Sequence, residues 1–307
     1  MNSDMEPAVI ASGLGRDYGT HTVLQGVNLS VPQGSVCALL GRNGVGKTTL
    51  LKLLSSLIQP THGTCTVLGD STWPRTAITL AKTGVVIDGF EPPLVARVKH
   101  LLELGAAASP SFDRKRADEL LKSREINPAK PWTELSKGQK RWCLLVTALC
   151  RKCDVLLLDE PADGLDPQSR VDLYQMVRRE ANETGLTALI ATHIISDIER
   201  VADRLAILHE KTILLESDLD TLRDELWVIT CDTAPAAADL PVSIEVLHQT
   251  TGTPTEIWIR QHESCDVPSL SGEIERRKPT VEELFRALTG KPSTEAAPEP
   301  TPAPVGS

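Results

Sequence analysis

Apolar runs suited to buried strands recur along the first two thirds of the chain. Four runs are rich in Val, Leu, Ile and Ala at nearly every position, as in strands covered on both faces. They occupy residues 36–40, 84–87, 155–158 and 186–191. A further strand of mixed polarity is predicted at 61–68, after a turn at Pro60.

Segments with helical spacing separate these strands. Leu50, Leu53, Leu54 and Leu57 have the spacing i, i+3, i+4, i+7 of one helix face, directly after the first run. A second helix is predicted over 168–182. Strands that alternate with helices indicate an α/β fold, in which helices cover both faces of a parallel sheet.

Other parts of the chain depart from this alternation. Residues 9–31 are predicted to form short strands and turns, and residues 94–149 are helical without a strand, which predicts a helical lobe at about 94–150. Within that lobe, 116–124 is amphipathic and another helix begins at Ser136, a typical N-cap residue.

The C-terminal part is predicted to be a small β/α appendix at 223–290, after a main domain at 1–222. Short alternating stretches at 227–231, 243–247 and 256–260 predict antiparallel strands, and 280–290 predicts a helix that ends at a glycine. Residues 291–307 are rich in Pro, Ala, Glu and Thr, which predicts a disordered tail.

Composition narrows the class of protein. The net charge of −9 argues against a broad basic surface, so we expect no nucleic-acid partner. No apolar run approaches the roughly 18 residues of a membrane helix, and the first residues lack a signal-peptide pattern, so we expect a cytoplasmic protein. Cys150 and Cys153 form a CxxC motif that suits either a redox or metal role, or buried core thiols.

The first candidate site is the segment from Gly41 to Thr48, which has the P-loop pattern G-x-x-x-x-G-K-T. It lies between a predicted strand and a predicted helix, where backbone N–H groups face an anion. Lys47 would reach the β- and γ-phosphates and Thr48 would bind Mg²⁺. The alternative is a glycine-rich turn without a ligand. The predicted nucleotide-binding residues of this segment are Gly41, Arg42, Asn43, Gly44, Val45, Gly46, Lys47, Thr48 and Thr49.

The second candidate site is the carboxylate pair Asp159 and Glu160 at the end of a predicted buried strand. Two acids at such a place need a compensating charge, which nucleotide-bound Mg²⁺ would supply. Asp159 is therefore a candidate magnesium residue, and Glu160 a candidate general base that polarises the attacking water. The alternative is a pair of carboxylates that caps a helix.

Between these sites, Leu135-Ser-Lys-Gly-Gln139 resembles the L-S-G-G-Q signature of the ATPase subunits of bacterial ABC transporters. Lys137 replaces the first glycine of that signature. The resemblance implies that Ser136, Gly138 and Gln139 bind the γ-phosphate held by the P-loop of another protomer. It also implies a P-loop NTPase parallel sheet with an N-terminal antiparallel β-subdomain and a helical signature lobe. The small C-terminal β appendix is predicted from its alternating stretches alone, because the resemblance covers little of that region.

The same resemblance assigns further residues. Tyr18 matches the aromatic residue that stacks on adenine, although a packed surface tyrosine is the alternative. Residues 164–166 match the loop that crosses the dimer interface, and His193 matches the histidine that contacts the γ-phosphate, where a structural histidine is the alternative. The family has Gln or Glu at a position that touches Mg²⁺, and this chain has the shorter Asp88 there.

Together these residues imply a subunit that hydrolyses ATP. It would pair head to tail with a second copy or a homologous ATPase subunit around two Mg-ATP, and drive separately encoded transmembrane permease subunits at the inner face of the cell membrane. Lys137 and the helix at 278–290 favour export. The alternatives are an ABC ATPase that acts in translation or DNA repair, and a regulatory nucleotide-binding module without turnover.

Overall fold

The computed structural model describes residues 6–92, 95–232, 243–261 and 273–290, and its contacts divide the chain into two compact units between Thr221 and Leu222. The predicted tail at 291–307 lies outside the described residues. The described residues form two sheets in the first unit and one in the second, and the candidate site residues all belong to the first unit.

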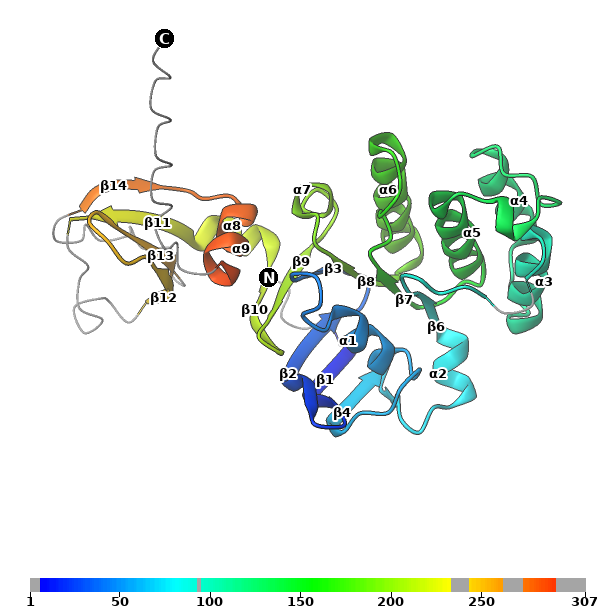
Figure 1. Ribbon diagram of the computed structural model, residues 1–307, viewed down its shortest axis with the longest axis horizontal. Helices are drawn as coiled ribbons and strands as arrows, with labels where there is room; N and C mark the ends of the chain where they lie inside the picture. Colours follow the sequence, from blue (N-terminus) through cyan, green and yellow to red (C-terminus); the bar gives the residue numbers. More distant parts are fainter. Residues whose placement is uncertain (1–5, 93–94, 233–242, 262–272, 291–307) are drawn as a thin grey trace, which may run out of the picture. The chain divides into compact units, whose positions relative to one another are not determined.

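The first unit contains a six-stranded sheet in the order β10-β9-β3-β8-β7-β6 (Figure 1). Neighbouring strands are parallel from β9 through β3, β8 and β7 to β6. Strand β10 pairs antiparallel with β9 at one edge. The predicted parallel sheet is therefore confirmed, whereas β9 and β10 were not predicted. The strands are β3 (Val36–Leu40), β6 (Thr83–Val86), β7 (Val155–Asp159), β8 (Thr187–Thr192), β9 (Arg204–His209) and β10 (Thr212–Asp218).

A second sheet of the same unit is antiparallel, in the order β2-β1-β4-β5. Its strands are β1 (Pro7–Tyr18), β2 (His21–Pro32), β4 (His62–Val67) and β5 (Asp70–Ser71). The sequence predicted several short strands over 9–31, but β1 and β2 are two long ones. Register shifts interrupt their pairing near Gly13, which adopts a φ of 56°, and such bulges break the alternation of apolar positions.

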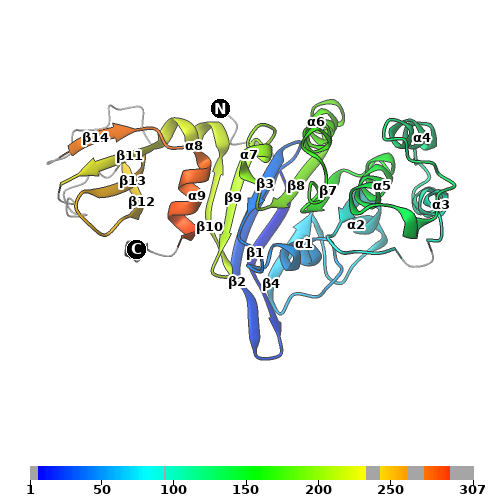
Figure 2. The ribbon, with the colours of Figure 1, turned by 45° about the horizontal axis from the view of Figure 1, so that its top comes forward.

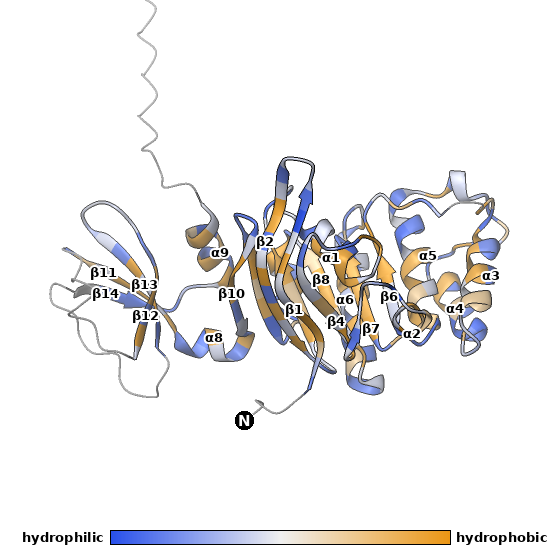
Figure 3. Ribbon diagram, turned by 90° about the horizontal axis from the view of Figure 1, so that it is seen from below, coloured by the Kyte–Doolittle hydropathy of each residue, from blue (hydrophilic) through white to orange (hydrophobic). Residues whose placement is uncertain are grey.

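Helix α1 (Lys47–Leu54) lies between the two sheets, and helix α6 (Pro167–Thr184) covers the opposite face of the six-stranded sheet (Figure 2). Figure 3 shows the hydrophobic residues concentrated on α1, β7 and β8. Leu50, Leu53 and Leu54 are fully buried there. Leu57 was wrongly predicted to share their face: it is 46% exposed, because α1 ends at Leu54 and the chain turns at Ser56, whose φ is 60°.

The predicted helical lobe is formed by helices that pack beyond the β6 edge of the sheet (Figure 1). It consists of α3 (Val98–Ala108), α4 (Arg114–Lys122), a 3₁₀ turn at Trp132–Glu134 and α5 (Lys137–Cys150). Two ion pairs tie α4 and the turn after it to α6: Arg116 with Glu180, and Arg124 with Asp172 at 2.7 Å. The remaining helices of this unit are α2 (Ala77–Lys82) and α7 (Ile195–Ile198).

The second unit is an antiparallel sheet in the order β12-β13-β11-β14, as predicted for the appendix apart from β14. It contains β11 (Leu226–Cys231), β12 (Ile244–Gln249), β13 (Thr255–Gln261), β14 (Glu273–Arg277) and α9 (Val281–Thr289), and α8 (Leu219–Glu225) spans the boundary between the units. Strand β14 was not predicted because four of its five residues are charged. Thr280 caps α9, and Gly290 follows it with a φ of −67°, so this glycine does not adopt the left-handed conformation of many helix ends.

We expect Leu53→Ala to lower the free energy of unfolding by about 2–5 kcal/mol, because it leaves a cavity between the two sheets. Leu57→Ala removes the same atoms from an exposed position and should cost under about 1 kcal/mol. Urea denaturation of the two variants measures the difference. Equal losses would contradict the burial of α1 between the sheets.

Candidate nucleotide-binding site

The candidate site lies at the carboxyl ends of β3, β8, β7 and β6, where parallel strands of a sheet deliver their following residues to one edge. Because β8 separates β3 from β7, the residues after β8 come between the P-loop and the carboxylate pair. A pocket of about 370 Å³ opens at this edge. Its lining comprises Val23, Arg42, Asn43, Gly44, Gly46, Lys47, Thr48, Thr49, Asp88, Asp159 and Glu160.

The P-loop glycines meet two different physical requirements. Gly44 and Gly46 have φ values of 81° and 116°, which side chains of L-residues rarely allow. Gly41 is needed for close approach, because a Cβ there would lie 2.7 Å from Val45 Cγ1 and 2.9 Å from the Leu208 carbonyl oxygen. The loop therefore has the tight conformation that its glycine spacing predicted.

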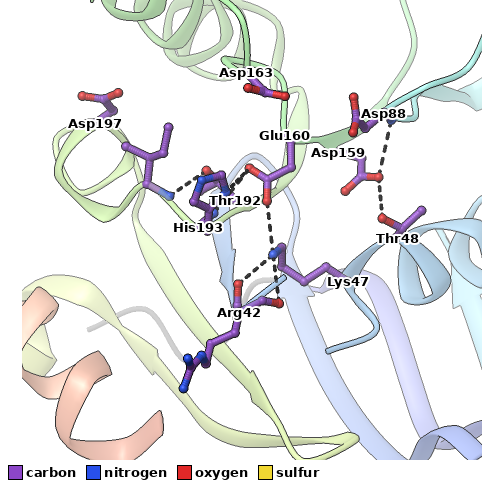
Figure 4. A network of polar contacts seen from close by, with 12 residues as sticks. Arg42, Lys47, Thr48, Asp88, Asp159, Glu160, Asp163, Thr192, His193 and Asp197 are labelled. Carbon is purple, nitrogen blue, oxygen red and sulfur yellow. Dashed lines mark hydrogen bonds and ion pairs between the residues drawn. The ribbon is translucent and has the colours of Figure 1, made fainter. Parts of the chain in front are cut away.

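Lys47 is held inside the loop with only 6% of its surface exposed. Its ammonium donates a hydrogen bond to the Gly41 carbonyl oxygen at 2.7 Å and lies 3.1 Å from Glu160 Oε1 (Figure 4). A buried ammonium requires such a counter-charge. The structure thus brings the predicted phosphate-binding lysine into contact with the predicted general base.

Thr48 and Asp159 form the second contact across the pocket. The Thr48 hydroxyl donates to Asp159 Oδ2 at 2.7 Å, and burial raises the pKa of Asp159 above its usual range. The other oxygen, Asp159 Oδ1, is buried and has no hydrogen-bond partner among the described residues. An orphaned carboxylate oxygen beside a hydroxyl suits Mg²⁺, which takes few protein ligands and keeps several waters or phosphate oxygens.

The Glu160 carboxylate is held between two basic side chains, Lys47 and His193. Its φ of 45° is unusual for a residue other than glycine, and its N–H donates to the Ala191 carbonyl oxygen at 2.8 Å. Oε2 lies 3.0 Å from His193 Nδ1, while Oε1 faces Lys47. Figure 4 shows the carboxylate between these two side chains. A strained residue with a constrained carboxylate is typical of a functional site.

Asp88 was predicted beside the magnesium residues, and its backbone is there: its N–H donates to Asp159 Oδ2 at 3.4 Å. Its carboxylate instead forms ion pairs with Arg141 and, at 3.7 Å, with Lys137. Figure 4 shows this carboxylate directed away from Thr48. Sequence analysis did not identify Arg141, although the cations at 137 and 141 are spaced to share one side of a helix.

The signature residues occupy the N-terminus of α5. Ser136 accepts a hydrogen bond from the Gln139 N–H, and the Gln139 side chain accepts one from the Ser136 N–H, a complete capping box. Gly138 packs against the loop at 164–166, since a Cβ there would lie 3.0 Å from the Gly164 carbonyl oxygen. A separate pocket of about 270 Å³ contains Ser136, Gly138 and Gln139.

Within one chain these two pockets remain apart. Among the described residues, none lines both the P-loop pocket and the signature pocket. Tyr18 also lines neither; it is 45% exposed at the end of β1, with the Arg16 guanidinium 4.6 Å from its ring centroid. The structure therefore joins Lys47, Thr48, Asp159, Glu160 and His193, but not the signature residues or Tyr18.

The CxxC motif has the chemistry of core thiols. Cys150 and Cys153 are both buried, and burial raises their thiol pKa values to about 12 and about 11. Thiols that stay protonated at neutral pH are poor nucleophiles and poor metal ligands. No group of three or more His, Cys, Asp or Glu side chains suited to a metal ion occurs in the described part of the chain.

Comparison with known proteins places this site in a family. The sequence profile of the ABC transporter family matches residues 24–163. The bacitracin transport ATP-binding protein BcrA of Enterococcus faecalis is 31% identical over 222 residues, covering 71% of each chain. The Nod factor export ATP-binding protein I of Paraburkholderia xenovorans (strain LB400) is 30% identical over 312 residues, covering 93% of this chain and 98% of that protein.

Solved structures agree with these relatives. The dimeric structure of a bacterial ABC transporter cassette is 25% identical, has a TM-score of 0.60 and matches 69% of this chain and 98% of its own. The P-loop pocket, the capped signature helix and these relatives lead to one conclusion: the chain belongs to the ABC transporter family, as one of its ATP-binding ATPase subunits.

Proposed function

We propose that this chain powers export through separately encoded transmembrane subunits, as a head-to-tail dimer around two Mg-ATP. The observation that carries the proposal is the division of the site. One chain has a pocket for the triphosphate and a second pocket at its signature helix, and no described residue lines both. A two-fold dimer would place the signature pocket of each chain opposite the P-loop pocket of the other.

In each site the P-loop residues 41–49 would bind the triphosphate. Lys47, Thr48 and Thr49 at the start of α1 line the pocket, and a helix N-terminus favours phosphate. Lys47 would move from Glu160 to the β- and γ-phosphates, which carry more negative charge. Tyr18 would stack on adenine, an interaction worth about 1–3 kcal/mol for stacked nucleic-acid bases.

Thr48 and Asp159 would hold Mg²⁺, with Asp88 reaching it through water. The metal, when bound, neutralises the charge of the phosphate oxygens during transfer of the γ-phosphoryl group. Support comes from the orphaned Asp159 Oδ1 beside the Thr48 hydroxyl. The fit is to a metal shared between protein and nucleotide, because few protein oxygens converge at this point.

Glu160 would polarise the attacking water as general base, and His193 would contact the γ-phosphate. Both roles are supported by the contact between His193 Nδ1 and Glu160 Oε2, which aligns the two side chains at the pocket. The strained φ of Glu160 directs its carboxylate toward Lys47, where the terminal phosphate would lie.

The second chain would complete the site with Ser136, Gly138 and Gln139. The N-terminus of α5, a helix of 14 residues, offers N–H groups and a positive dipole end to the γ-phosphate. Shifting an open-to-closed equilibrium from 1:99 to 99:1 takes about 5.5 kcal/mol, which two bridged γ-phosphates would contribute only in the closed state. The structural relative named above is also a dimer.

The membrane partner would dock beside the loop that follows β6 and carries Asp88 and Phe90. Phe90, Ile78 and Leu80 are exposed hydrophobic side chains on this loop and on α2. None of the described helices has the length and apolar character required to cross a membrane. Relatives named for bacitracin transport and Nod factor export support export as the direction, and attachment to permease subunits would place the protein at the inner face of the cell membrane.

We expect Glu160→Gln to reduce ATP turnover by at least about 100-fold while ATP stabilises a dimer, because the variant keeps the phosphate contacts and loses the base. Gel filtration with and without Mg-ATP detects the dimer. The control is Glu160→Gln combined with Lys47→Ala, which should remain monomeric with ATP. Monomeric Glu160→Gln in the presence of ATP would contradict the proposed dimer.

We expect Phe90→Glu combined with Ile78→Glu to reduce co-purification with co-expressed permease subunits by about tenfold or more, since charges cannot be buried in an apolar contact. Leu214→Glu is the control, because Leu214 is similarly exposed, at 47% against 53% for Phe90 and 55% for Ile78, but lies on β10 at the other edge of the sheet. Nucleotide binding should stay the same in all variants. Unchanged co-purification of the double variant would place the docking surface elsewhere.

A further inference from the structure

Asp88 connects two parts of the first unit. Its N–H contacts Asp159 in the P-loop pocket, and its carboxylate pairs with Arg141 and Lys137 in the first turns of α5. The two cations are four residues apart, so they lie on one side of that helix. A single residue thus contacts the predicted magnesium residues with its backbone and the signature helix with its side chain.

Arg141 depends on this carboxylate for charge compensation. Its side chain is 5% exposed, whereas Asp88 is 39% exposed. The Arg141 Nη2 donates to Asp88 Oδ1, and Nη1 is buried without a hydrogen-bond partner among the described residues. A buried guanidinium that loses its counter-charge is destabilised, so Arg141 opposes any movement of Asp88 away from it.

Lys137 extends the ion pair to the loop after Glu160. Its ammonium lies 2.6 Å from Asp163 Oδ2 and 3.7 Å from Asp88 Oδ1. The hydrogen bond from Lys137 lowers the pKa of Asp163 below its usual range, because the nearby ammonium stabilises the ionised carboxylate. The neighbouring Lys140 pairs with a different carboxylate, that of Glu91, at 2.8 Å.

We propose that Arg141, assisted by Lys137, is a positioning residue that competes with nucleotide-bound Mg²⁺ for the Asp88 carboxylate. This inference rests on the proposed function, in which Asp88 belongs to the magnesium site. The carboxylate faces α5 in one arrangement and the metal in the other. Metal binding at one P-loop is thereby linked to the start of the signature helix, which serves the other site of the dimer.

The competition predicts the direction in which Mg²⁺ affinity changes. Removing the Arg141 cation releases the Asp88 carboxylate and should strengthen Mg²⁺ binding. A cation that acted only through the general potential near the pocket would have the same effect from any nearby position. Lys140 therefore provides the matched control, because it lies next to Arg141 on α5, carries the same charge and pairs with a different carboxylate.

The experiment is a Mg²⁺ titration of the binding of a fluorescent, non-hydrolysable ATP analogue to the full chain. We expect Arg141→Met to lower the Mg²⁺ midpoint about tenfold, equivalent to about 1.4 kcal/mol. Lys137→Met should lower it about two- to threefold, since its contact is longer and its side chain is exposed. Lys140→Met should leave the midpoint within about twofold of the unmodified chain.

A double-mutant cycle with Asp88→Asn identifies the route of the effect. Asp88→Asn removes the contested carboxylate and should raise the midpoint, and adding Arg141→Met or Lys137→Met should then change it no further. Lys137→Met keeps the test valid if the loss of buried Arg141 prevents folding, because Lys137 is not part of the core.

The outcomes separate the two proposals. If the unmodified chain binds the analogue with a clear Mg²⁺ midpoint, but that midpoint is unchanged in Lys137→Met and Arg141→Met, the competition is overturned and the proposed function stands. A shift that persists in the Asp88→Asn background, or that Lys140→Met matches, also overturns it. If the unmodified chain shows no Mg²⁺-dependent binding, the proposed function fails and this inference fails with it.

Discussion

The contact between the buried ammonium of Lys47 and Glu160 is the interaction on which the site depends. A cation with so little exposure requires a carbonyl cage and a counter-charge, and Gly41 and Glu160 provide them. The same loop adopts left-handed backbone conformations at Gly44 and Gly46, which glycine allows without a steric cost. Glu160 supplies the counter-charge from the end of β7, and β8 lies between β7 and β3 in the sheet.

Much of this fold could be predicted from the sequence, because buried parallel strands are marked by their own composition. Strands β3, β7 and β8 and helices α1 and α6 were predicted within a few residues. Of the strands that were missed, β9 and β14 pair with residues distant in sequence, and β14 is mostly charged. Strand β10 forms a hairpin with β9 at the edge of the sheet. The exposure of Leu57 was not predicted, because its spacing fits the buried face of α1 but the helix ends at Leu54.

The candidate site also has features that the sequence predicted and features that it did not. Short-range features were predictable: the P-loop glycines and the Ser136 cap follow from local spacing and residue type. The pairing of Asp88 with Arg141 spans 53 residues, and nothing in the local pattern of either segment indicates it. Tyr18 was assigned by resemblance alone, and in the structure its ring faces Arg16 rather than the P-loop pocket.

The central claim is that each ATP site is shared between two chains, with a P-loop from one and a signature helix from the other. Mixing two inactive variants tests it directly: Lys47→Ala disables the P-loop and Ser136→Arg fills the signature pocket. A mixed dimer holds one site with both defects and one with neither, so an equal mixture should regain roughly a quarter of the unmodified hydrolysis rate. No recovery on mixing, or full turnover by the Ser136→Arg chain alone, would contradict the shared site.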